Sequence, residues 1–149
     1  MGRRPLRHAS RSAGIGPRPQ VTLVDTSVWI EVFRRRGALD LPALVSFDEV
    51  VTCLPVIQEV LQGFGEERAY RLASEAMRAL PAVESPLRLD LVEEAVGLYR
   101  TARRRGLTVR SSVDCLIAAC ALRHDLEVLH RDRDFAAIAR VSRLRQRNV

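Results

Sequence analysis

The stretch VTLVDTSVWI, residues 21–30, decides how this chain folds. Its first four residues are apolar or β-branched and predict a short buried strand. Asp25 follows the strand directly, and two hydroxyl residues, Thr26 and Ser27, come next. Burying a carboxylate is costly unless other groups compensate its charge. A core strand that ends on Asp25 therefore predicts that further groups of the chain meet this charge at the edge of a sheet.

The composition predicts one soluble domain. With 149 residues and 47% hydrophobic content, the chain can bury a single core. Its apolar runs are broken by charged residues and do not reach the about 20 residues of a membrane helix. Cys53, Cys115 and Cys120 form no disulfide or metal-binding spacing, which indicates buried thiols in a reducing, cytoplasmic compartment. All 24 basic residues are arginine, which excludes P-loop and Schiff-base lysine chemistry.

Residues 1–20 differ from the rest of the chain. They contain five arginines and no acid, so they supply +5 of the formal net charge of +6. Their Pro, Gly and Ser content without hydrophobic periodicity predicts a basic, disordered tail ahead of a domain at 21–149. The tail lacks the apolar segment of a secretory signal. A transit peptide and a natural start near Val21 are the alternatives.

Strand and helix patterns alternate after Val21. We expect strands at 21–24, 49–54, 107–109 and 126–130, and an edge strand at 142–146. Helices are expected at 27–37, 55–65, 66–80, 87–106, 112–124 and 134–140, with Ser112 as the N-cap of the fifth. The two long helices at 66–80 and 87–106 are predicted to form a hairpin that packs on the sheet. This alternation is typical of an α/β sandwich around a parallel sheet.

Four acidic residues are expected at one edge of this sheet, where the carboxyl ends of the strands form a ligand site. Asp25 ends the first strand, Glu59 lies one turn into the next helix, Asp114 lies in the first turn of the fifth helix, and Asp132 follows the fourth strand. Each alone has an ordinary explanation as a helix-end, solvated or turn residue. Together they would repel one another unless a cation neutralised them. Oxygen ligands of this kind favour Mg²⁺ or Mn²⁺ over zinc.

The blocks that carry these acids resemble a known family. They read LVDTSVWIE, LPVIQEVLQGF, SSVDCLIAACAL and VLHRDRDFAAIA, at residues 23–31, 54–64, 111–122 and 128–139. In this order they are similar to the motif blocks of PIN-domain ribonucleases, in particular the VapC toxins of toxin–antitoxin pairs. The resemblance covers about residues 21–140. It implies a PIN-like three-layer sandwich, with a central, mainly parallel sheet flanked by helices.

The resemblance also implies which residues form the site. The family's catalytic and metal-binding acids fall on four positions of this chain, with Ser27 as a supporting hydroxyl: Asp25, Glu59, Asp114 and Asp132. One position departs from the family, because His130 stands where a threonine is usual. We expect His130 to support or pack rather than to act as a base. Asp134 competes with Asp132 for the fourth acidic position and otherwise is expected to be the N-cap of the last helix.

The implied activity is Mg²⁺-dependent endonucleolytic cleavage of RNA by water, with Mn²⁺ as an alternative ion, giving 3′-hydroxyl and 5′-phosphate ends. Arginine clusters that could attract the RNA backbone are 34–36, 103–105 with Arg110, and Arg140, Arg143, Arg145 and Arg147. The implied partners are a small antitoxin of the VapB type and a second copy in a homodimer. A groove for the antitoxin is expected between Trp29 and Phe33 on one helix and Phe64 on the next.

Two other functions remain open. A non-catalytic PIN-like RNA-binding module would normally have lost some of the acids, and this chain keeps four. A metal-dependent small-molecule phosphatase with an aspartyl nucleophile usually has a second Asp two residues after the first, where this chain has Ser27. Both are therefore less well supported by the residues than the nuclease.

Overall fold

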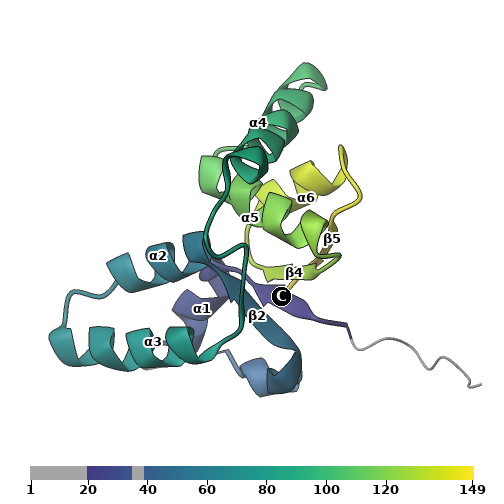
Figure 1. The fold of residues 1–149 in the computed structure, drawn as a ribbon. Coiled ribbons are helices and arrows are strands. Elements are labelled where there is room, and N and C mark those ends of the chain that lie inside the picture. The colour runs from purple at the N-terminus through teal and green to yellow at the C-terminus, as the bar shows by residue number, and fades with distance from the viewer. Residues whose placement is uncertain (1–19, 35–38) are drawn as a thin grey trace, which may run out of the picture.

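The computed structural model describes residues 20–34 and 39–149, and it is built around a parallel sheet (Figure 1). The predicted tail lies outside the described residues apart from Gln20. The strand order is β3-β2-β1-β4-β5, and each neighbouring pair is parallel. The strands are β1 (Thr22–Val24), β2 (Val50–Cys53), β3 (Ala82–Val83), β4 (Glu127–His130) and β5 (Arg145–Asn148). The strand order reverses at β1, and ligands of such sheets bind at the carboxyl ends beside this point.

The first strand occupies the centre of the sheet because its side chains suit burial on both faces. Thr22, Leu23 and Val24 are all buried, and Leu23 pairs with Val51 on one side and with Val128 on the other. Strands buried on both faces are typical of parallel sheets. Asp25, the residue that follows β1, therefore lies in the middle of the sheet edge formed by the carboxyl ends of the strands.

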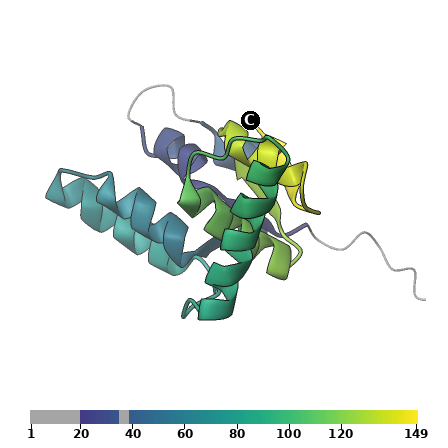
Figure 2. The ribbon, with the colours of Figure 1, turned by 90° about the horizontal axis from the view of Figure 1, so that it is seen from above.

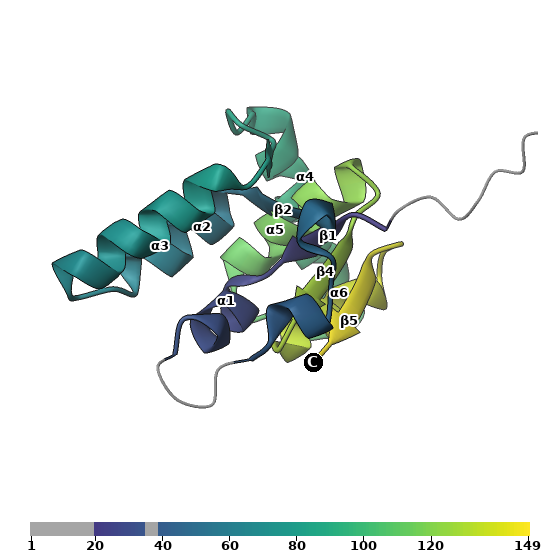
Figure 3. The same cartoon turned by 90° about the horizontal axis from the view of Figure 1, so that it is seen from below.

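Helices cover both faces of the sheet. They are α1 (Thr26–Val32), α2 (Leu54–Gln62), α3 (Glu67–Ala79), α4 (Leu89–Arg104), α5 (Ser112–Arg123) and α6 (Arg133–Ala139). α4, α5 and α6 pack together on one face, and α1 lies on the other (Figures 2 and 3). α2 and α3 run side by side and extend away from the sheet in all three views. The predicted three-layer α/β sandwich is confirmed.

Four local predictions are wrong. The helices expected to form a hairpin do not pair, because α3 packs beside α2 whereas α4 packs along α5. The expected strand at 107–109 is absent from the described residues, and β3 takes the place beside β2. The N-cap of α5 is Ser111, whose hydroxyl accepts from the Asp114 N–H, and not Ser112. The edge strand begins at Arg145, three residues later than expected.

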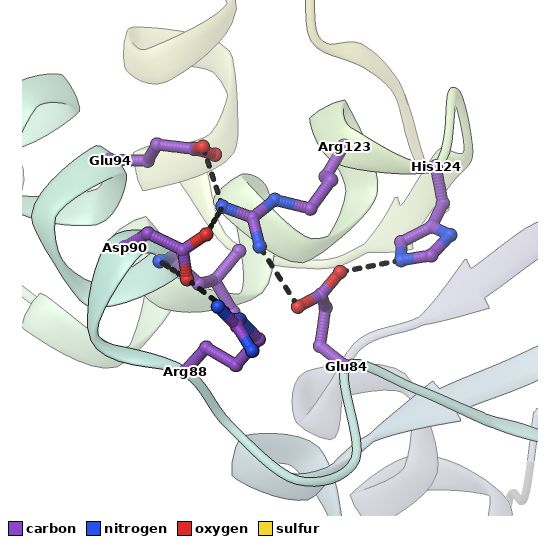
Figure 4. A network of polar contacts seen from close by, with 7 residues as sticks. Glu84, Arg88, Asp90, Glu94, Arg123 and His124 are labelled. Atoms are coloured by element: carbon purple, nitrogen blue, oxygen red, sulfur yellow. Dashed lines mark hydrogen bonds and ion pairs between the residues drawn. The ribbon is translucent and has the colours of Figure 1, made fainter.

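Arg123, the last residue of α5, ties this helix to α4 and to the segment before it (Figure 4). Its guanidinium lies 3.2 Å from Glu84, 3.4 Å from Asp90 and 2.6 Å from Glu94. The other Glu84 oxygen lies 2.7 Å from the ring of His124. Arg123 thus forms ion pairs with three carboxylates between Glu84 and Glu94. These pairs hold α4 against the end of α5.

The structure bears on the predictions made for the cysteines and for the apolar runs. Cys53, Cys115 and Cys120 are buried free thiols, as expected. Within residues 20–34 and 39–149, none of the helices combines the length and the apolar composition of a bilayer span.

Candidate metal and active site

Asp25 lies at the end of the central strand and is held in place by the helix that it starts. One carboxylate oxygen, Oδ2, accepts hydrogen bonds from the Ser27 N–H at 2.9 Å and from the Ser27 hydroxyl. The side chain is only 3% exposed. Its other oxygen, Oδ1, is buried and has no hydrogen-bond partner among the described residues. An anionic oxygen in this position requires a positive charge or a proton.

Asp114 presents a second oxygen of the same kind. It lies in the first turn of α5, is 6% exposed, and has its backbone N–H bound by the Ser111 hydroxyl. Its Oδ2 is buried, again without a hydrogen-bond partner in the part of the chain that the structure describes. Helix capping therefore places Asp114 but leaves one of its oxygens free for a ligand.

Asp132 and Asp134 follow β4 and have different contacts. The Asp132 carboxylate accepts from the Asp134 N–H at 2.9 Å and is the N-cap of α6, so the prediction that Asp134 takes this role is wrong. Asp134 instead reaches across to α5, where its Oδ2 accepts from the backbone N–H groups of Arg110 at 2.6 Å and Ser111 at 2.9 Å. One carboxylate oxygen each from Asp114, Asp132 and Asp134 lies within 4.8 Å of the others.

Glu59 approaches from α2 and is half-buried. Its Oε2 accepts a hydrogen bond from the Thr26 hydroxyl at 2.9 Å. Burial raises the Glu59 pKa above its ordinary value, and the nearby charges of Asp25 and Asp132 raise it further. The structure therefore brings the four predicted acids together, and it adds Asp134 to the same cluster.

The electrostatics of the cluster indicate a cation. Burial is the main cause that raises the pKa of Asp25 above its usual range. For Asp114, burial and then the charge of Asp25, followed by those of the other acids, raise the pKa to about 8. These carboxylates cannot all ionise at neutral pH without a counter-charge. The two buried oxygens, unpartnered within the described part of the chain, and an all-oxygen donor set fit a hard divalent cation.

The supporting residues connect the acids to one another. The Ser27 hydroxyl, besides donating to Asp25, accepts from the Arg131 N–H at 2.9 Å, so it joins the end of β1 to the turn after β4. His130 is fully buried, and its ring lies 4.9 Å from that of Phe135. Thr26 was not predicted to serve the site. Its only signal in the sequence is its position next to Asp25.

A small apolar pocket lies between α1 and α2, where the antitoxin groove is expected. It measures about 190 Å³ and is lined by Ile30, Phe33, Arg34, Val60, Gly63 and Phe64. The rings of Phe33 and Phe64 meet edge to face at 5.5 Å. Trp29 stacks on Phe33 with ring centroids 5.8 Å apart, is 3% exposed, and donates its indole N–H to the Val24 carbonyl at 3.1 Å. Trp29 is therefore a core residue.

Comparisons with known proteins agree with this geometry. The PIN domain family matches residues 22–141. VapC ribonuclease Mb1587 of Mycobacterium bovis and ribonuclease VapC11 of Mycobacterium tuberculosis are each 39% identical over 127 residues, which is 82% of this chain and 94% of the relative.

Solved structures share the fold. One is a chain of the structure of VapBC2 from Rickettsia felis bound to a DNA fragment from the VapBC2 promoter. It superposes on this chain with a TM-score of 0.68 at 13% sequence identity, and the match covers 86% of this chain and 98% of that chain. Another is VapC20 of Mycobacterium tuberculosis, described as a Sarcin-Ricin loop cleaving toxin. It superposes with a TM-score of 0.62 at 22% sequence identity, and the match covers 83% of this chain and 98% of that chain.

Proposed function

This chain belongs to the PIN domain family, among the VapC ribonucleases, and we propose from this premise that it is the endoribonuclease toxin of a toxin–antitoxin pair. The observation that carries the proposal is a cluster of five carboxylates in which Asp25 Oδ1 and Asp114 Oδ2 are buried and have no hydrogen-bond partner among the described residues. A phosphodiester nuclease needs such a site to hold a divalent cation.

Mg²⁺ is the proposed ion, with Mn²⁺ as a substitute. Asp25 and Asp114 would hold it directly, and Asp132 and Glu59 would complete the oxygen shell. When bound, such an ion supplies a Lewis acid that activates water and stabilises charge on the phosphate oxygens. The remaining task of the chain is to keep the carboxylates in place. Ser27 fixes Asp25, and Thr26 fixes Glu59.

Asp134 is proposed as a positioning residue rather than as the fourth ligand. Its Oδ2 is occupied by two backbone N–H groups of the segment that leads into α5. These bonds set the start of the helix that carries Asp114. Asp132 has no such long-range backbone bond among those that the structure describes, and it is half-buried and close to Asp114. It is therefore the better candidate for contact with the ion.

Arg110 is the arginine that we propose for contact with the RNA backbone. Its side chain is exposed, and its own backbone N–H is bound to Asp134, so it borders the acidic cluster. Arg145 and Arg147 instead pair with Asp125 and Glu127 near the opposite end of β4. Arg35 and Arg36 of the predicted 34–36 cluster lie outside the described residues. A positive charge beside the acids offsets their repulsion of phosphate.

A VapB-type antitoxin is the proposed protein partner. The pocket at Phe33 and Phe64 would accept an apolar side chain of the antitoxin, and an arginine elsewhere on the antitoxin would bind the carboxylates of the site. Such an arginine supplies the positive charge that the cluster lacks and blocks the site. Co-expression with a small protein encoded beside the toxin should give a complex without nuclease activity.

A second copy of the chain is the proposed occupant of an apolar groove between α4 and α5. The groove measures about 330 Å³ and includes Val92, Val96, Val113 and Leu116. Leu89 and Val96, both on α4, are 74% and 51% exposed. Apolar exposure of this extent on one helix is typical of a protein interface. Light scattering of the wild type and of Val96→Glu should show a dimer that the substitution dissociates.

The function is tested by incubating the purified chain with structured RNA and with a phosphate monoester, each with and without Mg²⁺. We expect RNA cleavage that requires Mg²⁺ and leaves 5′-phosphate ends. Hydrolysis of the monoester alone would indicate the phosphatase. RNA binding without cleavage, even with Mn²⁺, would indicate the non-catalytic module. Expression of the wild type alone should also arrest growth of a bacterial host, and Asp114→Asn should relieve the arrest.

A further inference from the structure

The turn after β4 is held by two side chains that bind successive backbone N–H groups. The Arg131 N–H donates to the Ser27 hydroxyl at 2.9 Å, and the Asp132 N–H donates to Nδ1 of His130 at 3.2 Å. The first bond comes from the end of β1 and the second from β4 itself. Both fix the backbone that carries Asp132.

The second bond defines the state of the His130 ring. A backbone N–H can only donate, so Nδ1 must accept, and the ring proton must lie on Nε2. Nε2 lies 2.5 Å from Oε1 of Gln146, and this amide oxygen can accept a hydrogen bond from the Nε2–H group. Gln146 belongs to β5, where it pairs in register with Val128. The edge strand thus supplies the group that selects the tautomer of a fully buried histidine.

We propose that Gln146 and His130 form a positioning relay for Asp132. Gln146 holds the proton on Nε2, which leaves Nδ1 free to bind the Asp132 N–H and sets the direction in which the Asp132 carboxylate points. This inference rests on the proposed function, because Asp132 serves the divalent cation there. It gives a role to the residue that departs from the family pattern and to a glutamine that has no signal in the sequence.

The alternative is that His130 only fills space beside Phe135. Two matched pairs of variants separate these roles. In His130→Asn, the amide Oδ1 takes the place of Nδ1 and keeps the acceptor, whereas His130→Leu keeps the volume and removes it. In Gln146→Glu, a carboxylate still accepts from Nε2–H, whereas Gln146→Leu offers no acceptor. A packing role would favour leucine over asparagine at 130, and positioning reverses this order.

Mn²⁺ affinity is the first readout, measured on the full chain from the electron paramagnetic resonance signal of free Mn²⁺. Loss of one buried hydrogen bond should weaken binding about five- to tenfold in His130→Leu and in Gln146→Leu. His130→Asn and Gln146→Glu should stay within about twofold of the wild type. If His130→Leu fails to fold, the Gln146 pair provides the same comparison.

The tautomer is the second readout, from long-range ¹H–¹⁵N NMR correlations of the His130 ring. We expect a proton on Nε2 in the wild type and in Gln146→Glu, and a mixture in Gln146→Leu. A proton on Nδ1 in the wild type would overturn the proposal. So would equal Mn²⁺ affinity in all folded variants, or an equal loss in His130→Asn and His130→Leu. A wild type that binds no Mn²⁺ would refute the proposed metal site itself, and the relay with it.

Discussion

Thr26 donates a hydrogen bond to Glu59 across 33 residues of sequence, at 2.9 Å, and thereby joins the start of α1 to α2. This bond lowers the Glu59 pKa, against the burial and the neighbouring charges that raise it. Thr26 therefore both aims the Glu59 carboxylate and favours its ionised form.

Thr26→Val should weaken the site without unfolding the chain. The substitution keeps the side-chain shape and removes the donor, so Glu59 loses its orientation and its pKa rises. We expect about a tenfold loss of cleavage at limiting Mg²⁺, since supporting bonds of this kind typically contribute 10–100-fold. Cleavage rates over a range of Mg²⁺ concentrations test this, with Thr26→Ser as the control that keeps the hydroxyl. Equal rates in both variants would contradict it.

Asp25→Asn and Asp114→Asn should each reduce cleavage by at least about 100-fold, because each removes a proposed ligand of the ion. The same substitutions should raise the melting temperature of the metal-free protein, since burial and neighbouring acids raise the pKa of each carboxyl, which costs folding free energy at neutral pH. Melting in EDTA and RNA cleavage in Mg²⁺ measure the two effects. Asp48→Asn is the matched control, because Asp48 is an exposed acid in a different turn. Full activity in Asp25→Asn would argue against the site.

The metal-free protein should lose stability as the pH rises from about 5 to about 8. The Asp114 pKa is raised from 3.8 to about 8 in the folded state. Above pH 3.8 the unfolded chain releases the Asp114 proton, whereas the folded state keeps it until the pH passes about 8. The folded state therefore binds more protons between these two pH values, and the free energy of unfolding falls as the pH rises through them. Urea unfolding in EDTA at several pH values measures the slope. Asp114→Asn should flatten it, and Mg²⁺ should stabilise the wild type most at the upper end.

Arg123→Met should lower the melting temperature and leave RNA cleavage unchanged. The substitution keeps the aliphatic stem but removes the charge that gathers Glu84, Asp90 and Glu94, so three acids repel one another at the end of α5. High salt should shrink the difference from the wild type, because these pairs are partly exposed to solvent. Thermal melting at low and high salt tests this, with Arg78→Gln on α3 as the control. A difference independent of salt would point to packing instead.

The sequence allowed the fold class and the acidic cluster to be predicted because both depend on local patterns. Apolar strands followed by Asp25 and Asp132 are visible without tertiary information. β3 was missed because Ala82–Val83 is too short to show alternation. The N-cap of α6 was assigned to Asp134 instead of Asp132 because either residue fits that position. Only the bonds from Arg110 and Ser111, far along the chain, distinguish them.

The Ser27 hydroxyl meets an N–H group 104 residues further along the chain, and this distance has a consequence for folding. A chain that has formed only its first strands and helices holds Asp25 and Glu59, but nothing yet brings Asp114 or Asp132 to them. Contacts of such high sequence separation form late, after the entropy of closing long loops has been overcome. Nuclease activity should therefore appear and vanish together with the cooperative folding transition, and no partly folded intermediate should be toxic.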